Sequence, residues 1–311
     1  MLSTPLRQAV FWTLCLILLV MAPFFFIGGL DWTASPLERA LWNSGHGFFF
    51  FCFALTILLT DRWQGWQAWL VITTAVAVVG VSIEVVQSKV GRVFDWHDVL
   101  LNLTGAWLAL VLWPRARWRP VPLWSVLVVS VVLLGGREAL HLSRLAMDEW
   151  RLQTQLPLVF DQSRPDNLRY WQGNIGWTDE QEGRYAQPLR LDLTHRRLYT
   201  GVFISRLPRD WRGYDQLQFR LYNPEPEDWY MTLRINDRAH DQGESDFNNR
   251  YNVRLPLTPG WNEFTLPLAD VKQAPRDREM DLNRIQRLGL FATGLESPRF
   301  VLLDDLRLSR E

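Results

Sequence analysis

Five long stretches without a charged side chain dominate the first half of this 311-residue chain. They cover residues 8–30, 40–60, 63–83, 99–114 and 120–136. A helix rises about 1.5 Å per residue, so roughly 20 apolar residues are needed to cross the ~30 Å hydrocarbon core of a bilayer. The first three stretches are long enough, and the last two must recruit flanking residues. The sequence therefore predicts an α-helical transmembrane bundle of five helices.

The first stretch follows Arg7 and has the layout of a secretory signal. It lacks a small-x-small cleavage site, because Phe24, Phe25 and Phe26 stand where such a site belongs. We expect a retained anchor whose end is kinked by Pro23.

Charge separates the chain into two different halves. Residues 1–149 carry 10 Lys and Arg against 9 Asp and Glu, whereas residues 150–311 carry 23 against 24. The second half is therefore ordinary for a soluble domain, and no basic tract indicates nucleic-acid binding. Both cysteines, Cys15 and Cys52, lie in apolar stretches, so the polar half has no disulfide.

A polar stretch from Glu84 to Gly105 joins the third and fourth apolar stretches and extends acids and amides into both. Its residues fall on two helical stripes. One stripe holds Gly80, Glu84 and Gln87, and the other holds Asp95, Asp98, Asn102 and Gly105. Glycines on such stripes let neighbouring membrane helices approach closely. Because the fourth apolar stretch makes only about 24 Å of helix, it draws Asp98, His97 and Asp95 to the membrane boundary.

Topology gathers these polar residues on one side of the membrane. In any five-span arrangement, the start of the second span, the end of the third and the start of the fourth face the same side. The residues on this face are His46, Glu84, Gln87, Arg92, Asp95, Asp98 and Asn102. Ionisable groups near a bilayer are costly unless they pair or face a cavity, so the cluster indicates a functional site. The expected ligand-binding residues are Glu84, Gln87, Arg92, Asp98 and Asn102.

Two alternatives stay open for the same cluster. In a structural network, Arg92 would satisfy Glu84 and Asp98, and the polar side chains would only hold helices together. In an enzyme, neighbouring carboxylates would push each other's pKa values apart and so supply an acid and a base. The catalytic candidates are His46, Glu84, Asp95 and Asp98.

Metal binding is not favoured by the spacing of these donors. No pair has the spacing of a HExxH or CxxC motif, and His97 lies off the stripe that holds Asp95 and Asp98. A metal site needs three or more convergent ligands. We therefore expect no metal and no cofactor.

The combined pattern resembles the signature of the VanZ-like family. The matching residues are Glu84-x-x-Gln87, Arg92 and Asp95-x-x-Asp98-x-x-x-Asn102-x-x-Gly105. His46, which precedes the aromatic residues 48–51, matches a histidine of an upstream span in that family. The acid–lysine pair that precedes this histidine in the family is replaced by Trp42 and Asn43. The resemblance covers about residues 8–113 and implies a bacterial membrane protein with a role in the cell envelope.

From about Leu158 the pattern changes to a period of two residues. Eight short alternating runs lie at 190–195, 199–205, 217–223, 230–236, 252–257, 263–268, 287–292 and 300–308. Turn signals such as Asn223-Pro224 separate them. This spacing predicts an all-β C-terminal domain with a β-sandwich fold. Between the two halves, Arg137 to Leu156 should continue the fifth helix until Pro157 ends it.

The phrases Gly260-Trp261-Asn262 and Leu303-Asp304-Asp305 resemble those of jelly-roll modules related to carbohydrate-binding and galactose-binding-like domains. The resemblance spans about residues 158–311 and implies aromatic rings that stack on sugars. The stacking candidates are Trp229, Tyr230 and Tyr251, together with Tyr222 and Trp177. The alternative is that most of these rings belong to the core. The polar segment from Asn236 to Asn252 could bind calcium or line a ligand groove, but the favoured interpretation is a solvated loop.

These patterns predict a VanZ-like transmembrane domain at 1–145, a linker or helix extension at 146–157 and a β-sandwich at 158–311. The basic count on the two sides is equal, but the dense Arg115–Arg119 cluster favours a cytoplasmic N-terminus. The protein would then be a multi-pass inner-membrane protein with a periplasmic sandwich.

The leading hypothesis is an accessory envelope protein that engages glycans or lipid-linked glycans beside the lipid bilayer. The alternatives are a hydrolase or transferase that acts on a lipid-linked glycan, and a purely structural membrane protein. The sequence does not determine the oligomeric state.

Overall fold

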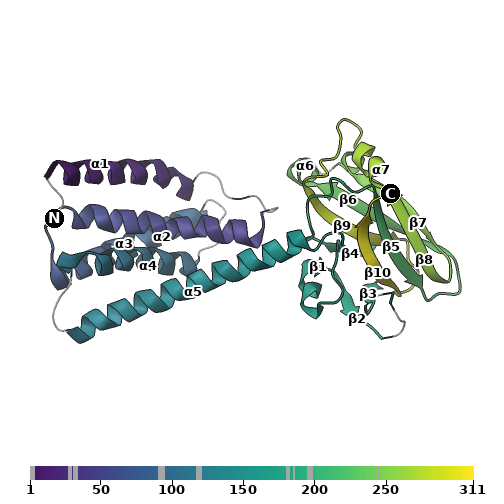
Figure 1. Ribbon diagram of the computed structural model, residues 1–311, viewed down its shortest axis with the longest axis horizontal. Helices are drawn as coiled ribbons and strands as arrows, with labels where there is room; N and C mark the ends of the chain where they lie inside the picture. Colours follow the sequence, from purple (N-terminus) through teal and green to yellow (C-terminus); the bar gives the residue numbers. More distant parts are fainter. Residues whose placement is uncertain are drawn as a thin grey trace. The chain divides into compact units, whose positions relative to one another are not determined.

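The computed structural model describes residues 4–26, 30, 34–89, 95–116, 121–179, 183–184, 186–194, 199–243 and 246–311. The chain divides into two compact units, Met1–Met147 and Asp148–Glu311. The first unit is helical, and the second is built on two β-sheets (Figure 1). This confirms the predicted combination of a helical membrane bundle and an all-β domain.

Five α-helices form the N-terminal part of the structure. They are α1 (Thr4–Met21), α2 (Pro36–Leu58), α3 (Gly65–Lys89), α4 (Trp96–Leu112) and α5 (Val121–Thr154). Within the described residues, four of them are long and apolar enough to cross a membrane. Four candidate spans thus stand against the five predicted, because α4, the fourth predicted span, has only 17 residues, about 25 Å of helix.

Local chemistry explains where several of these helices begin and end. Asp95 caps α4, since its side chain accepts a hydrogen bond from the backbone N–H of His97 at 2.8 Å, and so the helix does not extend further back. Ser35 and Glu38 form a capping box at the start of α2. At Pro23, α1 gives way to a short 3₁₀ helix, η1 (Ala22–Phe25), earlier than the apolar stretch suggested.

The last turns of α5 belong to the second unit, which begins at Asp148. Leu152 packs into the core of the sandwich. The Asp148 carboxylate accepts hydrogen bonds from the Tyr170 hydroxyl at 2.6 Å and from Arg206 at 2.8 Å. The helix ends at Thr154, as the position of Pro157 predicted.

The second unit contains two five-stranded antiparallel sheets. The strands are β1 (Trp171–Gln172), β2 (Ile175–Trp177), β3 (Leu189–Leu193), β4 (Tyr199–Ile204), β5 (Gln216–Asn223), β6 (Trp229–Asp237), β7 (Tyr251–Leu257), β8 (Gly260–Pro267), β9 (Ile285–Thr293) and β10 (Arg299–Ser309). One sheet has the order β1-β4-β9-β6-β7, and the other has β2-β3-β10-β5-β8. All eight predicted strands are present, and the short β1 and β2 are additional.

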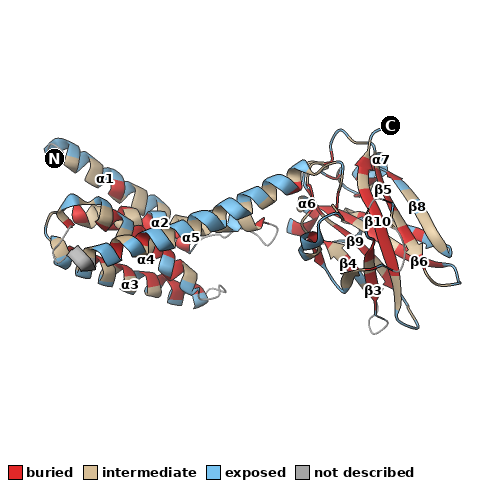
Figure 2. Ribbon diagram, turned by 60° about the horizontal axis from the view of Figure 1, so that its bottom comes forward, coloured by how far each residue is buried: buried red, intermediate tan, exposed pale blue. Residues whose placement is uncertain are grey.

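Alternation along the strands builds the core between the two sheets. On β5, for example, Leu217, Phe219 and Leu221 are buried while the intervening residues are half-buried. Two short helices, α6 (Arg238–Gln242) and α7 (Leu268–Gln273), follow β6 and β8. Figure 2 shows that buried positions concentrate in the sheets of the second unit and along α2, α3 and α4 of the first.

Candidate functional site

Three polar side chains from three different helices converge inside the helical unit. His46 lies on α2, Glu84 on α3 and Asp98 on α4, and they are only 4%, 1% and 4% exposed. One nitrogen or oxygen atom from each lies within 4.8 Å of those from the other two. His46 Nε2 is 3.6 Å from Asp98 Oδ2. The structure therefore brings together three of the residues that the sequence placed on one membrane face.

A close contact between α2 and α4 makes this convergence possible. Gly47 follows His46, and Gly105 lies two turns after Asp98. A Cβ atom added at Gly105 would lie 1.9 Å from the carbonyl oxygen of Gly47. No residue larger than glycine fits at position 105 without moving a helix, as expected for small residues between membrane helices.

Asn102 extends the cluster by one turn along α4. It is 1% exposed, and its amide nitrogen would lie 2.8 Å from a Cβ atom at Gly80 on α3. Gly80 stands one turn before Glu84, so the Asn102 amide lies in the same α3–α4 seam as the two carboxylates. Within the described part of the chain, neither amide atom of Asn102 has a hydrogen-bond partner.

The remaining predicted members have local structural contacts. Gln87 is buried, and its side-chain amide donates to the backbone carbonyl of Phe25 at 2.7 Å. Asp95 is exposed, caps α4, and donates its backbone N–H to Glu84 Oε2 at 3.0 Å. Arg92, with its predicted pairing to Glu84 and Asp98, lies outside the described residues.

An apolar cavity of about 370 Å³ reaches this cluster through His46. It is lined by Met21, Phe24, Phe25, Leu41, Trp42, Gly45 and His46. The Phe25 and His46 rings meet edge to face with their centroids 4.7 Å apart. The imidazole therefore stands between a pair of buried carboxyl groups and a cavity with aromatic walls.

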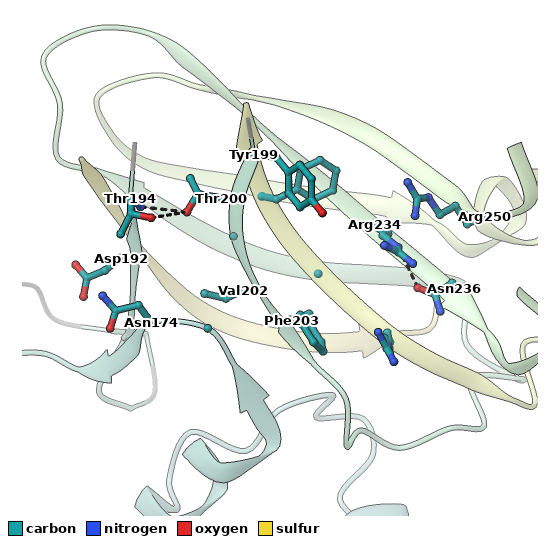
Figure 3. A pocket seen from close by; sticks show the side chains of 15 residues that line it. Asn174, Asp192, Thr194, Tyr199, Thr200, Val202, Phe203, Arg234, Asn236 and Arg250 are labelled. Atoms are coloured by element: carbon teal, nitrogen blue, oxygen red, sulfur yellow. Dashed lines mark hydrogen bonds between the residues drawn. The ribbon is translucent and has the colours of Figure 1, made fainter. Parts of the chain in front are cut away.

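A larger cavity, of about 720 Å³, lies in the second unit on the outer face of the β1-β4-β9-β6-β7 sheet. We call it the sandwich groove. Its floor is formed by residues that point away from the core on β4 and β9, with β6 and Arg250, the residue before β7, beside them. In Figure 3, Arg234, Arg250 and Asn236 gather at one end, and Asn174, Asp192 and Thr194 lie at the other.

Aromatic rings occupy the middle of the sandwich groove. Tyr199 is 68% exposed and meets Phe291 at 6.4 Å between ring centroids. Phe291 is paired across the strands with Gly201, and Phe203 is paired with Gly289. Each phenylalanine therefore faces a glycine on the paired strand rather than a second large side chain, and the Arg287 guanidinium lies 5.1 Å from the centroid of the Phe203 ring. The groove thus has an aromatic floor on which Tyr199 is the exposed ring.

Three arginines give the groove a positive end. Arg234 Nε donates a hydrogen bond to Asn236 Oδ1 at 3.2 Å, and Arg234 Nη2 lies 3.3 Å from His240 Nε2. Arg287 lies 3.5 Å from the Asp241 carboxylate. Burial, reinforced by the neighbouring guanidinium of Arg250, lowers the pKa of Arg234 to about 10. The positive charge at this end thus exceeds what nearby acids compensate.

The aromatic residues that the sequence proposed for stacking lie elsewhere. Trp229 and Tyr251 are 7% and 8% exposed and belong to the hydrophobic core, which matches the alternative left open for them. The Trp229 indole N–H donates to Asn223 Oδ1 at 2.8 Å. Tyr230 is exposed and shares the outer face of β6 with Arg234, but the Arg254 guanidinium covers its ring at 3.8 Å.

The two other stacking candidates are likewise in contact with neighbouring aromatic rings. Trp177 is half-buried and stacks on Phe160, and Tyr222 lies 5.3 Å from Trp261 between ring centroids. The segment that begins at Asn236 is not the solvated loop that was predicted. Asn236 and Asp237 end β6 and are buried, and α6 follows them.

The sequence missed Tyr199, Phe203 and Phe291 as candidate binding residues. A signal was available, since Tyr199, Gly201 and Phe203 alternate with the aliphatic Val202 and Ile204 along β4. If the aliphatic positions face the core, the aromatic positions must face outward. Both sets are apolar, however, so the face could be assigned only from the pairing of the strands.

Together, the fold and these sites define a multi-pass helical membrane protein with a C-terminal β-sandwich. Residues 9–118 match the protein family described as VanZ/LLP1. The N-terminal part of the chain is therefore a VanZ-like membrane domain, as its polar pattern predicted. No curated protein matches the chain.

Solved structures that are similar to the chain include carbohydrate-binding modules. A family 11 module from Clostridium thermocellum, in complex with a β-1,3-1,4-mixed-linked tetrasaccharide, is 13% identical with a TM-score of 0.34, and the match covers 45% of this chain and 84% of that one. A family 30 module of a cellulosomal cellulase from Clostridium thermocellum is 16% identical with a TM-score of 0.33, covering 44% and 83%.

An agarase is 18% identical with a TM-score of 0.35, and the match covers 46% of this chain and 24% of the agarase. At these low TM-scores, function is inferred from the side chains of this protein alone.

Proposed function

We propose that this protein is a membrane-anchored accessory protein of the bacterial envelope that binds an anionic glycan in the sandwich groove. The observation that carries the proposal is the groove itself, with an aromatic floor, the exposed ring of Tyr199 and three arginines at one end. Its volume, about 720 Å³, falls in the range of protein sites for small ligands, roughly 300–1,000 Å³.

A sugar chain fits the chemistry of this groove. The apolar face of a pyranose ring packs on an exposed aromatic ring, and Tyr199 presents such a ring at the centre of the groove. The sugar hydroxyls require planar donors and acceptors around that ring. Asn174 and Asp192 supply them at one end, and the guanidinium groups of Arg234 and Arg250 supply donors at the other.

A negative charge on the glycan would meet the arginine end. Guanidinium groups bind carboxylate, sulfate and phosphate through paired hydrogen bonds. The mutual proximity of Arg234, Arg250 and Arg287, which helps lower the pKa of Arg234, is relieved when an anion binds between them. We place the sandwich on the extracytoplasmic side, where envelope glycans lie. The Arg115–Arg119 cluster favours a cytoplasmic N-terminus, and α4, which is short but covered by its neighbours, is counted as a fifth crossing, so that the two ends of the bundle face opposite sides. A reporter fused after Glu311 tests that orientation.

Binding of defined glycans to the full-length protein in nanodiscs tests the proposed function. We expect anionic polysaccharides to bind and Tyr199→Ala to weaken binding about tenfold, which corresponds to about 1.4 kcal/mol. Arg250→Gln should weaken only anionic ligands. Tyr230→Ala and Arg212→Gln are the matched controls, since both alter exposed side chains outside the groove lining. Absence of binding to any envelope glycan would refute the proposal.

A second candidate function is favoured by the apolar cavity that reaches His46. A membrane enzyme, a hydrolase or transferase, could hold the lipid tail of a lipid-linked glycan there and use Asp98, Glu84 and His46 as acid and base. In that case Asp98→Asn and Glu84→Gln would abolish turnover while ligand binding is retained. If the cluster is only structural, both substitutions would lower thermal stability without any effect specific to a ligand.

A further inference from the structure

The buried cluster of the helical unit has the donor set of a cation site. His46 offers an imidazole nitrogen, and Glu84 and Asp98 each offer a carboxylate oxygen. Each donor comes from a different helix, so their convergence is a property of the fold rather than of a short motif. Imidazole with carboxylate is a ligand combination that suits first-row divalent cations.

The distances within the cluster fit coordination. Metal bonds to imidazole nitrogen and carboxylate oxygen are about 2.0–2.2 Å, which separates two ligand atoms on a tetrahedral ion by roughly 3.4 Å. His46 Nε2 and Asp98 Oδ2 are 3.6 Å apart. All three donor atoms lie within 4.8 Å of one another, so small side-chain rotations would complete the geometry.

Two further features support the site. Glu84 is oriented by the backbone N–H of Asp95, which donates to Oε2 at 3.0 Å, as groups around a metal site orient its ligands. Asn102 supplies a buried amide whose two polar atoms have no hydrogen-bond partner in the described chain. A buried polar group without a hydrogen bond costs free energy, so its presence beside the carboxylates points to a ligand that is needed there.

We propose that His46, Glu84 and Asp98 bind one first-row divalent cation, Zn²⁺ or Mn²⁺, with the Asn102 amide oxygen as a further donor. This differs from the sequence-based expectation of no metal, which rested on the absence of a local motif. The site does not depend on glycan binding by the sandwich groove.

A neighbouring set of donors provides the natural comparison. Asp95, His97 and Asp98 also lie within 4.8 Å of one another. However, Asp95 is exposed and caps α4, and His97 Nε2 is 3.1 Å from Glu138 Oε2. The inner set is the better site because all three of its side chains are buried. The two sets share only Asp98, so substitutions outside Asp98 separate them.

The test uses the full-length protein in nanodiscs, stripped with a chelator and titrated with ZnCl₂ or MnCl₂ alone. We expect one equivalent per chain by elemental analysis and calorimetry. Glu84→Gln and His46→Gln should each weaken binding at least tenfold. His97→Gln is the matched control and should leave the affinity unchanged.

Further outcomes decide the proposal if a variant is poorly folded. Asn102→Asp replaces an amide by a carboxylate of the same shape and should tighten Mn²⁺ binding. A stoichiometry near zero in the wild-type protein would overturn the proposal. So would loss of binding in His97→Gln with binding retained in His46→Gln, since the ion would then occupy the outer set.

Discussion

The contact between α2 and α4 yields the sharpest prediction about the membrane half. Replacing Gly105 by alanine would place a methyl group 1.9 Å from the Gly47 carbonyl oxygen. Because a carbon–oxygen contact needs about 3.3 Å, the two helices must separate locally by roughly 1.4 Å. His46, which neighbours Gly47 on α2, would then move away from Asp98 on α4. The 3.6 Å distance between His46 Nε2 and Asp98 Oδ2 depends on the close contact of the two helices.

The expected loss of stability can be isolated by a second glycine on α2. An added methyl group at Gly45 has no neighbour within 4 Å, so Gly45→Ala gains helix propensity, about 1 kcal/mol, without overlap. Gly105→Ala has the same gain in propensity. The difference in the free energy of unfolding between the two variants therefore measures the cost of the overlap. We expect about 1–3 kcal/mol, near the upper end because the added methyl group overlaps a backbone carbonyl rather than a flexible side chain.

The two cysteines allow the unfolding of the helical unit to be measured separately from that of the sandwich. Cys15 and Cys52 lie on α1 and α2, Cys52 is buried, and the sandwich has no cysteine. A thiol-reactive fluorophore added during heating of the full-length protein therefore reports unfolding of the helical unit only. We expect Gly105→Ala to melt below wild type and Gly45→Ala at or above it. Equal melting temperatures for the two variants would refute the close packing of α2 on α4.

Three further expectations concern stability. Asp237 is buried and accepts hydrogen bonds from Arg278 at 2.5 and 2.6 Å, so Asp237→Asn should destabilise the sandwich by about 3–5 kcal/mol, measured by hydrogen exchange of β6. The half-exposed Asp210 is the control, and Asp210→Asn should cost under about 1 kcal/mol. Burial alone would raise the pKa of Asp237, but the Arg278 hydrogen bonds hold it below its usual value; the stabilisation is therefore complete above about pH 4, and wild type and Asp237→Asn should converge as the pH falls through that lowered pKa. Ser35→Ala removes the capping box with Glu38 and should lower the stability of the helical unit by about 1 kcal/mol in the thiol assay.

Much of the architecture followed from periodicity in the sequence. The strands of the sandwich were predicted because alternation persists over five or more residues, as in the runs that became β5 and β9. β1 and β2 were missed, since two and three residues are too few to show a period. The first apolar stretch runs to residue 30, and Pro23 was expected to kink the end of its helix. In the structure α1 ends at Met21, and the 3₁₀ helix η1, which contains Pro23, follows.

The candidate sites were predictable to different degrees. The membrane cluster was predicted from helical stripes, since the spacing of Glu84 and Asp98 fixes which face each occupies. The sandwich groove was not, because its arginines and aromatic rings come from strands whose order in the sheet is not local in sequence. Trp229 and Tyr199 look alike in the sequence, and only the pairing of β9 with β4 on one side and with β6 on the other shows which one faces outward.

The short α4 reconciles the membrane fold with its polar interior. Eight of its 17 residues are buried, whereas the four candidate spans have between 11% and 33% of their most apolar windows buried. A helix that is covered by its neighbours does not need to match the hydrocarbon thickness, and it can carry Asp98 and Asn102 because protein rather than lipid surrounds them. Its N-terminal end, which attracts negative charge, holds Asp98 and binds Glu84 through the N–H of Asp95. The helix that fails the length criterion for a span is thus the one that positions the buried cluster.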